Sequence, residues 1–278
     1  TNAARWIETG DADIIVAGGT ENMSRYPYLA RDARWGVRMG DVTMADGIIE
    51  VLNDPFKRYH MGMTAEHLVD RWHLTREDMD EHAAISHQRA IAAISEGRFK
   101  GQIVPVEARQ GRKTVVIDTD EHPRPDTTLE DLAHLQPVFK AGGTVTAGNA
   151  SGLNDGAAAL LVVEESKARR LGLEGLARIV STGVAGVAPH RMGLGPVPST
   201  YIALERAGIG VADLDLIELN EAFAAQALSC IRELNLDANR VNVNGGAIAL
   251  GHPVGCSGAR IATTLVHEMV RREVSRGL

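Results

Sequence analysis

The chain has 278 residues, a formal net charge of −7, 44% hydrophobic residues and only 4% aromatic residues. This length is enough for two domains with a sizeable aliphatic core, and the negative charge argues against binding to nucleic acid. No apolar run approaches the ~20 residues of a membrane-spanning helix, and no signal or transit peptide is visible. The two cysteines, Cys230 and Cys256, show no pairing or zinc-ligand spacing, which indicates a reducing compartment and no metal site.

The first 60 residues read as a helix, a strand and an irregular segment. Thr1 is not a start residue, and residues 1–9 resemble the last turns of a helix closed by Gly10. Residues 13–17 predict a buried strand that ends in two glycines. Residues 24–60 are irregular but too apolar for a disordered linker, so we expect them to pack on something, such as another subunit. The chain begins without a start residue and, at residues 275–278, stops at a turn. We expect it to be cropped at both ends, or to be a gene fragment.

The next part predicts two helices, a pair of short strands and a third helix. One helix opens near Tyr59 and runs to His73. Thr75 and Asp78 have the spacing of a capping box, which predicts a second helix that ends at Gly97. Residues 103–106 and 114–118 read as strands, and residues 129–135 as a short helix.

A polar loop at residues 143–156 then leads into residues 157–163, which we expect to be a fully buried strand. Its small residues and exposed amides suit a ligand that passes close to backbone. Residues 167–175 are basic and contain glycines, and they mark the expected domain boundary.

The last hundred residues alternate between strand and helix patterns. Residues 177–184 predict a strand, and Ser199 is expected to cap a helix that ends at Gly208. Residues 213–219, 222–234, 241–244 and 257–272 then predict strand, helix, strand, helix. This alternation predicts an α/β layer with right-handed connections.

Two stretches of this layer contain side chains that could take part in catalysis. The sequence GGAIALGHPVGCSGAR ends at Arg260 and presents one imidazole, His252, between glycines that let a ligand approach the ring. The sequence NEAF begins at Asn220, at the end of a strand, where open α/β sheets place their sites. An isolated GHP sequence would more often mark a structural turn, but the neighbouring NEAF favours a catalytic interpretation.

Together with GTVTAGNASGLNDGAA from Gly143 and VAGGTENMS from Val16, these stretches resemble the thiolase family, whose members make or cleave 3-ketoacyl-coenzyme A. The resemblance spans the chain. It implies an α/β thiolase fold of two similar βαβαβ-type halves, the first half mostly missing here, plus an inserted α+β loop domain. The implied division is residues 1–168 for the rest of the N-terminal domain, with the loop domain at about 24–145, and residues 175–278 for the C-terminal domain.

The implied reaction is a Claisen condensation of two acetyl-CoA to acetoacetyl-CoA and CoA through an acyl-cysteine. The imidazole of His252 would activate the thiol, and Asn220 would hold a water that helps to stabilise an oxyanion. The family's two catalytic cysteines would lie outside this chain, and we assign Cys256 no catalytic role.

The resemblance also implies a binding site for the acyl group and for coenzyme A, which is a substrate; no cofactor is expected. Arg124, held extended by two prolines, would lie near the phosphates at the adenosine end, and Ser151 would bond to the pantetheine arm. The full set of implied substrate-binding residues is Ser151, Arg124, His60, Met61, Phe139, Ala147, Leu153, Met192 and Phe223.

Several alternatives stay open at this point. Residues 59–62 and the segment GVRMGD (36–41) resemble short-chain acetoacetyl enzymes, in which that segment ties together a homotetramer, a dimer of dimers. The stretch from Asp120 also resembles degradative 3-ketoacyl-CoA and 3-oxoadipyl-CoA thiolases. A non-catalytic, CoA- or lipid-binding relative is a further alternative, whereas a ketosynthase is disfavoured by NEAF and GHP. We expect a cytoplasmic protein whose partners are small acyl-CoA molecules, with no membrane or nucleic acid.

Overall fold

The computed structural model describes all residues from 1 to 278. Its first half contains α1 (Asn2–Glu8), β1 (Ile14–Asn22), η1 (Met23–Arg25), β2 (Tyr28–Leu29), η2 (Arg31–Trp35), β3 (Ala45–Asp46), α2 (Gly47–Val51), α3 (Met61–Trp72), α4 (Arg76–Ser95), β4 (Val106–Gln110), β5 (Lys113–Ile117) and α5 (Leu129–Ala133). The second half contains β6 (Asp155–Val163), α6 (Glu165–Arg170), η3 (Pro189–Leu194), α7 (Pro196–Ala207), η4 (Val211–Asp213), α8 (Ala224–Glu233), α9 (Ala247–Leu250) and α10 (Val254–Arg272).

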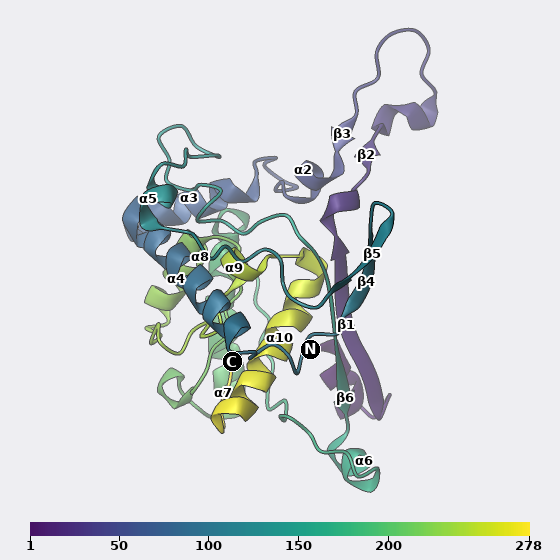
Figure 1. Ribbon diagram of the computed structural model, residues 1–278, viewed down its shortest axis with the longest axis vertical. Helices are drawn as coiled ribbons and strands as arrows, with labels where there is room; N and C mark the ends of the chain where they lie inside the picture. The colour runs from purple at the N-terminus through teal and green to yellow at the C-terminus, as the bar shows by residue number, and fades with distance from the viewer.

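Strands β1 and β6 form an antiparallel pair that lies against helix α10 (Figure 1). Their register runs from Ile14 opposite Val163 to Asn22 opposite Asp155. The sequence predicts a buried strand at 13–17 and a fully buried strand at 157–163, and the predicted burial is wrong for both. Only one face of the pair meets α10, so side chains alternate between half-buried and exposed, and Val16 on the open face is 73% exposed.

The contact between this strand pair and α10 depends on glycine. A Cβ atom on Gly19 would overlap the carbonyl oxygen of Gly255, at the start of α10. In the opposite direction, a Cβ atom on Gly255 would lie 2.5 Å from the carbonyl oxygen of Thr20. The Gly255 N–H also donates to the Glu21 carboxylate at 3.1 Å. Backbone therefore packs directly on backbone where the first half of the chain meets the second.

Helices α3, α4, α8 and α9 pack together on the other side of α10 (Figure 1). Their shared core is aliphatic and alanine-rich, as the composition predicts. The capping box predicted for α4 is present, because the Thr75 hydroxyl accepts from the Asp78 N–H at 3.0 Å and the Asp78 carboxylate accepts from the Thr75 N–H at 3.1 Å. The glycine expected to close this helix, Gly97, has φ +72°.

The predicted parallel layer is present as three short segments. Leu216 pairs in parallel with Gly277, and Ile217 pairs in parallel with Val241, so the segment at 215–219 lies between the other two. The strand predicted at 177–184 is absent as a strand, because no neighbouring backbone in the chain pairs with it. Helix α7 ends at Gly208 as predicted but begins at Pro196, so Ser199 does not cap it; its hydroxyl donates to the carbonyls of Gly195 and Pro196.

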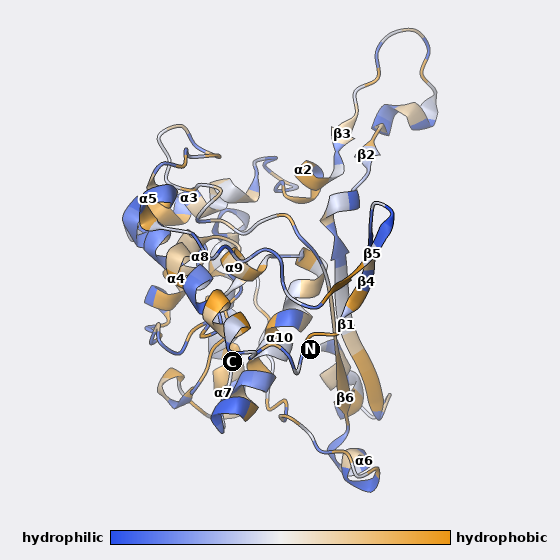
Figure 2. Ribbon diagram, in the orientation of Figure 1, coloured by the Kyte–Doolittle hydropathy of each residue, from blue (hydrophilic) through white to orange (hydrophobic).

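The arm from β2 to β3 stands out from the body of the molecule (Figure 1). Apolar and polar residues are mixed along it (Figure 2), and its apolar side chains include Trp35, 90% exposed, and Met39, 100% exposed. The arm contains the GVRMGD segment and has no core of its own. No helix in the structure is both long enough and apolar enough to cross a bilayer.

Candidate active site

Asn220 is held in place through the residues on either side of it. The side chain of Asn242, in a left-handed backbone conformation with φ +46°, pairs with both backbone groups of Leu219. It accepts from the Leu219 N–H at 2.8 Å and donates to the Leu219 carbonyl at 2.7 Å. The residue that follows, Glu221, is 1% exposed. Only the side chain of Asn220 is therefore free to adjust.

The Glu221 carboxylate joins several elements beneath the site. It accepts from the Ser86 hydroxyl at 2.8 Å, the Asn242 amide at 2.8 Å and the backbone N–H of Ile248 at 3.2 Å. The ring of His82 lies 3.2 Å away. Burial alone would raise the pKa of Glu221, but hydrogen bonds from His82, Asn242 and Ser86 lower it to about 2. The carboxylate is thus a charged structural anchor between α4 and α9.

The turn before α10 presents His252 toward Asn220. Gly251 has φ +94°, and the backbone N–H of His252 donates to the Asn154 side chain at 3.2 Å. On one side of the ring, His252 Nδ1 lies 2.6 Å from the Ser257 hydroxyl, on the first turn of α10. On the other side, Nε2 lies 3.3 Å from the Asn220 amide nitrogen. His252 and Asn220, which two separate motifs identify as candidate catalytic residues, are therefore in contact.

These contacts assign the protons on the ring. The Ser257 hydroxyl has one proton, which it donates to the Pro253 carbonyl at 3.0 Å. His252 Nδ1 then donates to the Ser257 oxygen, and Nε2 carries the lone pair on the side of Asn220. Burial, and then the charge of Arg260, lower the pKa of His252. The imidazole is consequently neutral at pH 7 and able to accept a proton through Nε2.

Neither cysteine of the chain has the surroundings of a nucleophile. Burial raises the pKa of Cys230 to about 12, and its thiol donates to the Gly193 carbonyl at 3.2 Å. Burial also raises the pKa of Cys256, which is 2% exposed. A protonated, covered thiol is a poor nucleophile, in agreement with the absence of a catalytic assignment for Cys256.

Four of the predicted substrate-binding residues form an aromatic cluster near Asn220. The ring of His60 stacks on Phe139 with centroids 4.6 Å apart, and Phe139 meets Phe223 edge-on at 6.0 Å. Met61 packs against the same core. Gly62 has no side chain because a Cβ atom there would overlap the Phe139 ring. Ser151 lies beside this cluster, and its hydroxyl donates to the Ala222 carbonyl at 3.0 Å.

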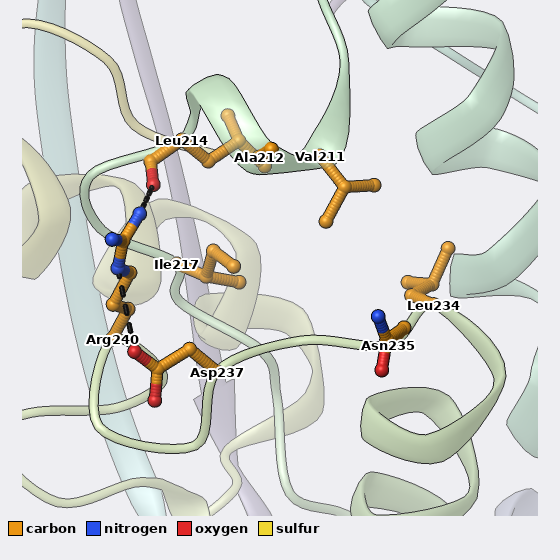
Figure 3. A pocket seen from close by; sticks show the side chains of 8 residues that line it. All are labelled: Val211, Ala212, Leu214, Ile217, Leu234, Asn235, Asp237 and Arg240. Carbon is orange, nitrogen blue, oxygen red and sulfur yellow. Dashed lines mark hydrogen bonds and ion pairs between the residues drawn. The ribbon is translucent and has the colours of Figure 1, made fainter.

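The other predicted binding residues lie at the surface of the molecule. The side chains of Arg124, Ala147 and Leu153 are exposed, and Met192 lies on η3 with 38% exposure. A separate hollow of about 390 Å³ lies between η4, the end of α8 and the 237–240 turn (Figure 3). Its lining is mostly apolar, and Arg240 at its edge donates to the Leu214 carbonyl at 2.7 Å. None of the predicted site residues lines this hollow.

Two family models together match almost the whole chain. Residues 1–166 match the model described as thiolase, N-terminal domain, and residues 173–278 match the model described as thiolase, C-terminal domain. The chain belongs to the thiolase family.

Similar proteins include acetyl-CoA acetyltransferases and a β-ketothiolase. The chain is 56% identical to an acetyl-CoA acetyltransferase of Pseudomonas aeruginosa, over 99% of this chain and 70% of that protein. It is 55% identical to a β-ketothiolase of Cupriavidus necator, over 97% of this chain and 69% of that protein. The crystal structure of the Bacillus anthracis acetyl-CoA acetyltransferase has a TM-score of 0.97 and 49% identity, covering 99% of this chain and 70% of that one. The predicted thiolase fold is therefore confirmed.

Sequence reasoning missed the residues that hold the thiolase motifs in position. Ser257 and Asn154 orient His252, and Asn242 and Glu221 orient Asn220. Ser257 lies five residues after the histidine within the motif, so its position in the sequence was a usable signal. Asn154 and Asn242 act across 98 and 23 residues of sequence, respectively, and nothing local in the sequence distinguishes them from turn residues.

Proposed function

We propose that the protein containing this chain is an acyltransferase that reversibly condenses two acetyl-CoA to acetoacetyl-CoA and CoA. The contact between His252 Nε2 and the Asn220 amide at 3.3 Å carries this proposal. It unites a proton acceptor and a polar amide from two separate motifs, close to the aromatic cluster of His60, Phe139 and Phe223. The acetyl-CoA acetyltransferase names of the similar proteins support the same reaction.

In the proposed mechanism, His252 accepts the proton of a thiol nucleophile through Nε2. The thiolate attacks the carbonyl carbon of acetyl-CoA, the bond between that carbon and the CoA sulfur breaks, and CoA leaves as its thiol with a proton from a second acid, so that the acetyl group becomes a protein thioester while His252 keeps its proton on Nε2. A base then removes a proton from the methyl carbon of a second acetyl-CoA. The resulting carbanion attacks the protein thioester, which forms acetoacetyl-CoA and regenerates the thiol.

Asn220 would assist where negative charge develops on the thioester oxygen. Its Oδ1 atom is buried and has no protein donor. We propose that it accepts a hydrogen bond from a water that donates its other proton to that oxygen. This water and the Nε2–H of the protonated His252 ring would together stabilise the enolate.

Coenzyme A is proposed to lie along Ser151 and the aromatic cluster, with its phosphates toward Arg124. The solved human mitochondrial 3-ketoacyl-CoA thiolase in complex with CoA resembles this chain with a TM-score of 0.94 and 46% identity, covering 98% of this chain and 68% of that one. We also propose a cytoplasmic homotetramer, assembled partly through the β2–β3 arm, whose exposed apolar side chains need a covering surface.

A thiolysis series tests the reaction and its chain length. The intact protein is mixed with free CoA and 3-ketoacyl-CoA substrates of four or more carbons, and kcat/KM is measured for each. Acetoacetyl-CoA is expected to be the best substrate. A preference for longer chains would support the degradative alternative instead, and no thiolysis of any substrate would support the non-catalytic, CoA- or lipid-binding alternative.

A further inference from the structure

The segment at 118–127, which carries Arg124, makes no backbone-to-backbone hydrogen bond with any part of the chain. It connects β5 to α5. A segment without such bonds is held only by its side chains and by side chains that reach it. Its position must therefore be set by a small number of contacts.

The first contact is made by His87. Within the run Pro123–Arg124–Pro125, only Arg124 has a backbone N–H, because proline has none. This single donor bonds to His87 Nδ1 at 3.1 Å. His87 lies on α4 and is 6% exposed, so its ring is fixed by the helix core.

The second contact is made by His122. Its Nδ1 lies 2.8 Å from the Ala249 carbonyl, within α9 and three residues before His252. The opposite edge of the ring packs on Gly152, where a Cβ atom would overlap Nε2. The rings of His87 and His122 lie nearly parallel, with centroids 6.5 Å apart. The two histidines thus link α4, the Arg124 segment and the turn that carries His252.

The protonation states suit these contacts. His87 must be neutral at Nδ1 to accept the Arg124 N–H. Burial, and then the charges of His122 and Arg124, lower the pKa of His87 to about 4, while Glu221 acts in the opposite direction. At pH 7 the acceptor is therefore present.

We propose that His87 and His122 are positioning residues for coenzyme A: they hold the Arg124 segment in register with the catalytic turn. This inference rests on the proposed function, since it assigns Arg124 to the phosphates of the substrate. His87 fixes the position of the Arg124 backbone through its hydrogen bond. His122 fixes the distance between that backbone and the turn that carries His252. Loss of either contact leaves the arginine present but misplaced.

Two substitutions at His87 separate the hydrogen bond from the ring. His87→Phe keeps an aromatic ring against His122 but removes the acceptor. His87→Asn removes the ring but keeps an oxygen close to the position of Nδ1. Each variant of the intact protein is compared with the unsubstituted protein by calorimetric CoA binding and by kcat and KM for two thiolysis reactions. One is acetoacetyl-CoA with CoA, and the other is acetoacetyl-pantetheine with pantetheine, which lack the adenosine and its phosphates.

His87→Phe is expected to raise the Kd and KM for CoA about three- to tenfold, the range for misplacing one charged hydrogen bond. The rates with acetoacetyl-pantetheine should stay unchanged, and His87→Asn should restore most of the CoA affinity. His134→Ala is the control, because His134 bonds only within its own turn, to the Glu130 carbonyl at 2.7 Å.

The inference is overturned if His87→Phe binds CoA as tightly as the unsubstituted protein, if His87→Asn is as impaired as His87→Phe, or if both substrates lose activity equally. Failure of the proposed function gives a different result: the unsubstituted protein itself would bind no CoA or would cleave neither substrate.

Discussion

At the scale of single residues, His252 and Asn220 are expected to contribute unequally. His252→Ala should lower kcat by about 10²–10⁴, because it removes both the base and an oxyanion donor. Asn220→Ala should cost less, because a second water can shift into the space of the amide. The double variant should lose less than the product of the two single losses, since both side chains serve one oxygen.

Steady-state kinetics on the three purified variants would measure these losses, with melting temperatures as the folding control. Near-normal turnover of His252→Ala at an unchanged melting temperature would show that the GHP turn is structural. Strictly multiplicative losses would show that the two residues act on different steps.

The proposed contact between Arg124 and the phosphates of CoA is tested by removing the arginine side chain. Arg124→Ala should raise the KM for CoA several-fold, corresponding to the ~1 kcal/mol of a partly exposed charged hydrogen bond. Turnover of acetoacetyl-pantetheine should change little, because that substrate carries none of the phosphates. Equal losses with the two substrates would assign the arginine a structural role.

The residues proposed to react stand out in the sequence more than the residues that orient them. His252 and Asn220 lie in motifs whose local composition indicates a site. The Asn242 side chain makes the two backbone hydrogen bonds to Leu219 that a neighbouring strand would otherwise make. This role depends on the left-handed backbone conformation of Asn242, which the sequence does not reveal. The same limit applies to His87, whose partner Arg124 lies 37 residues away.

At the scale of elements, the stability of the fold is expected to depend in opposite ways on the charges of two neighbouring glutamates, Glu221 and Glu218. Glu221 links α4 to α9 as a carboxylate, and its pKa is lowered to about 2. Glu218 is also buried, but burial raises its pKa to about 8 despite Arg260, whose guanidinium lies 3.7 Å away. One carboxyl group is thus charged at pH 7, whereas the other is mostly protonated.

Glu221→Gln should lower the free energy of unfolding at pH 7 by about 2–4 kcal/mol, because an amide NH₂ would face the Ser86, Asn242 and Ile248 donors. Glu218→Gln is the matched control and should not destabilise, since it keeps a neutral side chain. Urea unfolding of both variants would measure this. Equal destabilisation would mean that volume, not charge, holds this segment.

The two pKa shifts also fix the sign of the pH dependence. A lowered folded pKa makes the contribution of Glu221 fully present above pH 4.5 and lost as the pH falls through that value toward 2. A raised folded pKa makes Glu218 cost stability progressively as the pH rises from 4.5 to 8. Glu218→Gln should therefore gain stability relative to the unsubstituted protein over that second range.

Elements defined by local signals were predicted well, and those defined by partners were not. The α4 capping box and the glycine after α7 follow from nearby residues alone. Residues 177–184 have a strand pattern, but a strand also needs a neighbouring backbone, and none pairs with them. The exposure of one face of β1 and β6 has the same cause, because composition cannot reveal which faces are covered.

At the scale of the whole molecule, the β2–β3 arm is expected to control assembly. Light scattering on the intact protein should report a tetramer at micromolar concentration. Changing both Trp35 and Met39 to Ser should shift it to a dimer, because these side chains, 90% and 100% exposed, need a partner surface. Phe56→Ser is the control, since Phe56 is 76% exposed but lies outside the arm. A monomeric protein, or a double variant that remains tetrameric, would exclude this role.

The backbone contact between Gly19 and Gly255 has a consequence for how the sequence can diverge. At most packed positions, a larger side chain on one element is accommodated by a smaller one on its neighbour. Here each missing Cβ faces main-chain atoms, those of Gly255 and of Thr20, which no substitution can shrink. No compensating pair of changes exists, so each of these positions can accept another residue only if α10 moves away from β1. Such a movement would carry His252, three residues before Gly255, with it, so a side chain at either glycine is expected to displace the proposed catalytic histidine as well as to weaken packing.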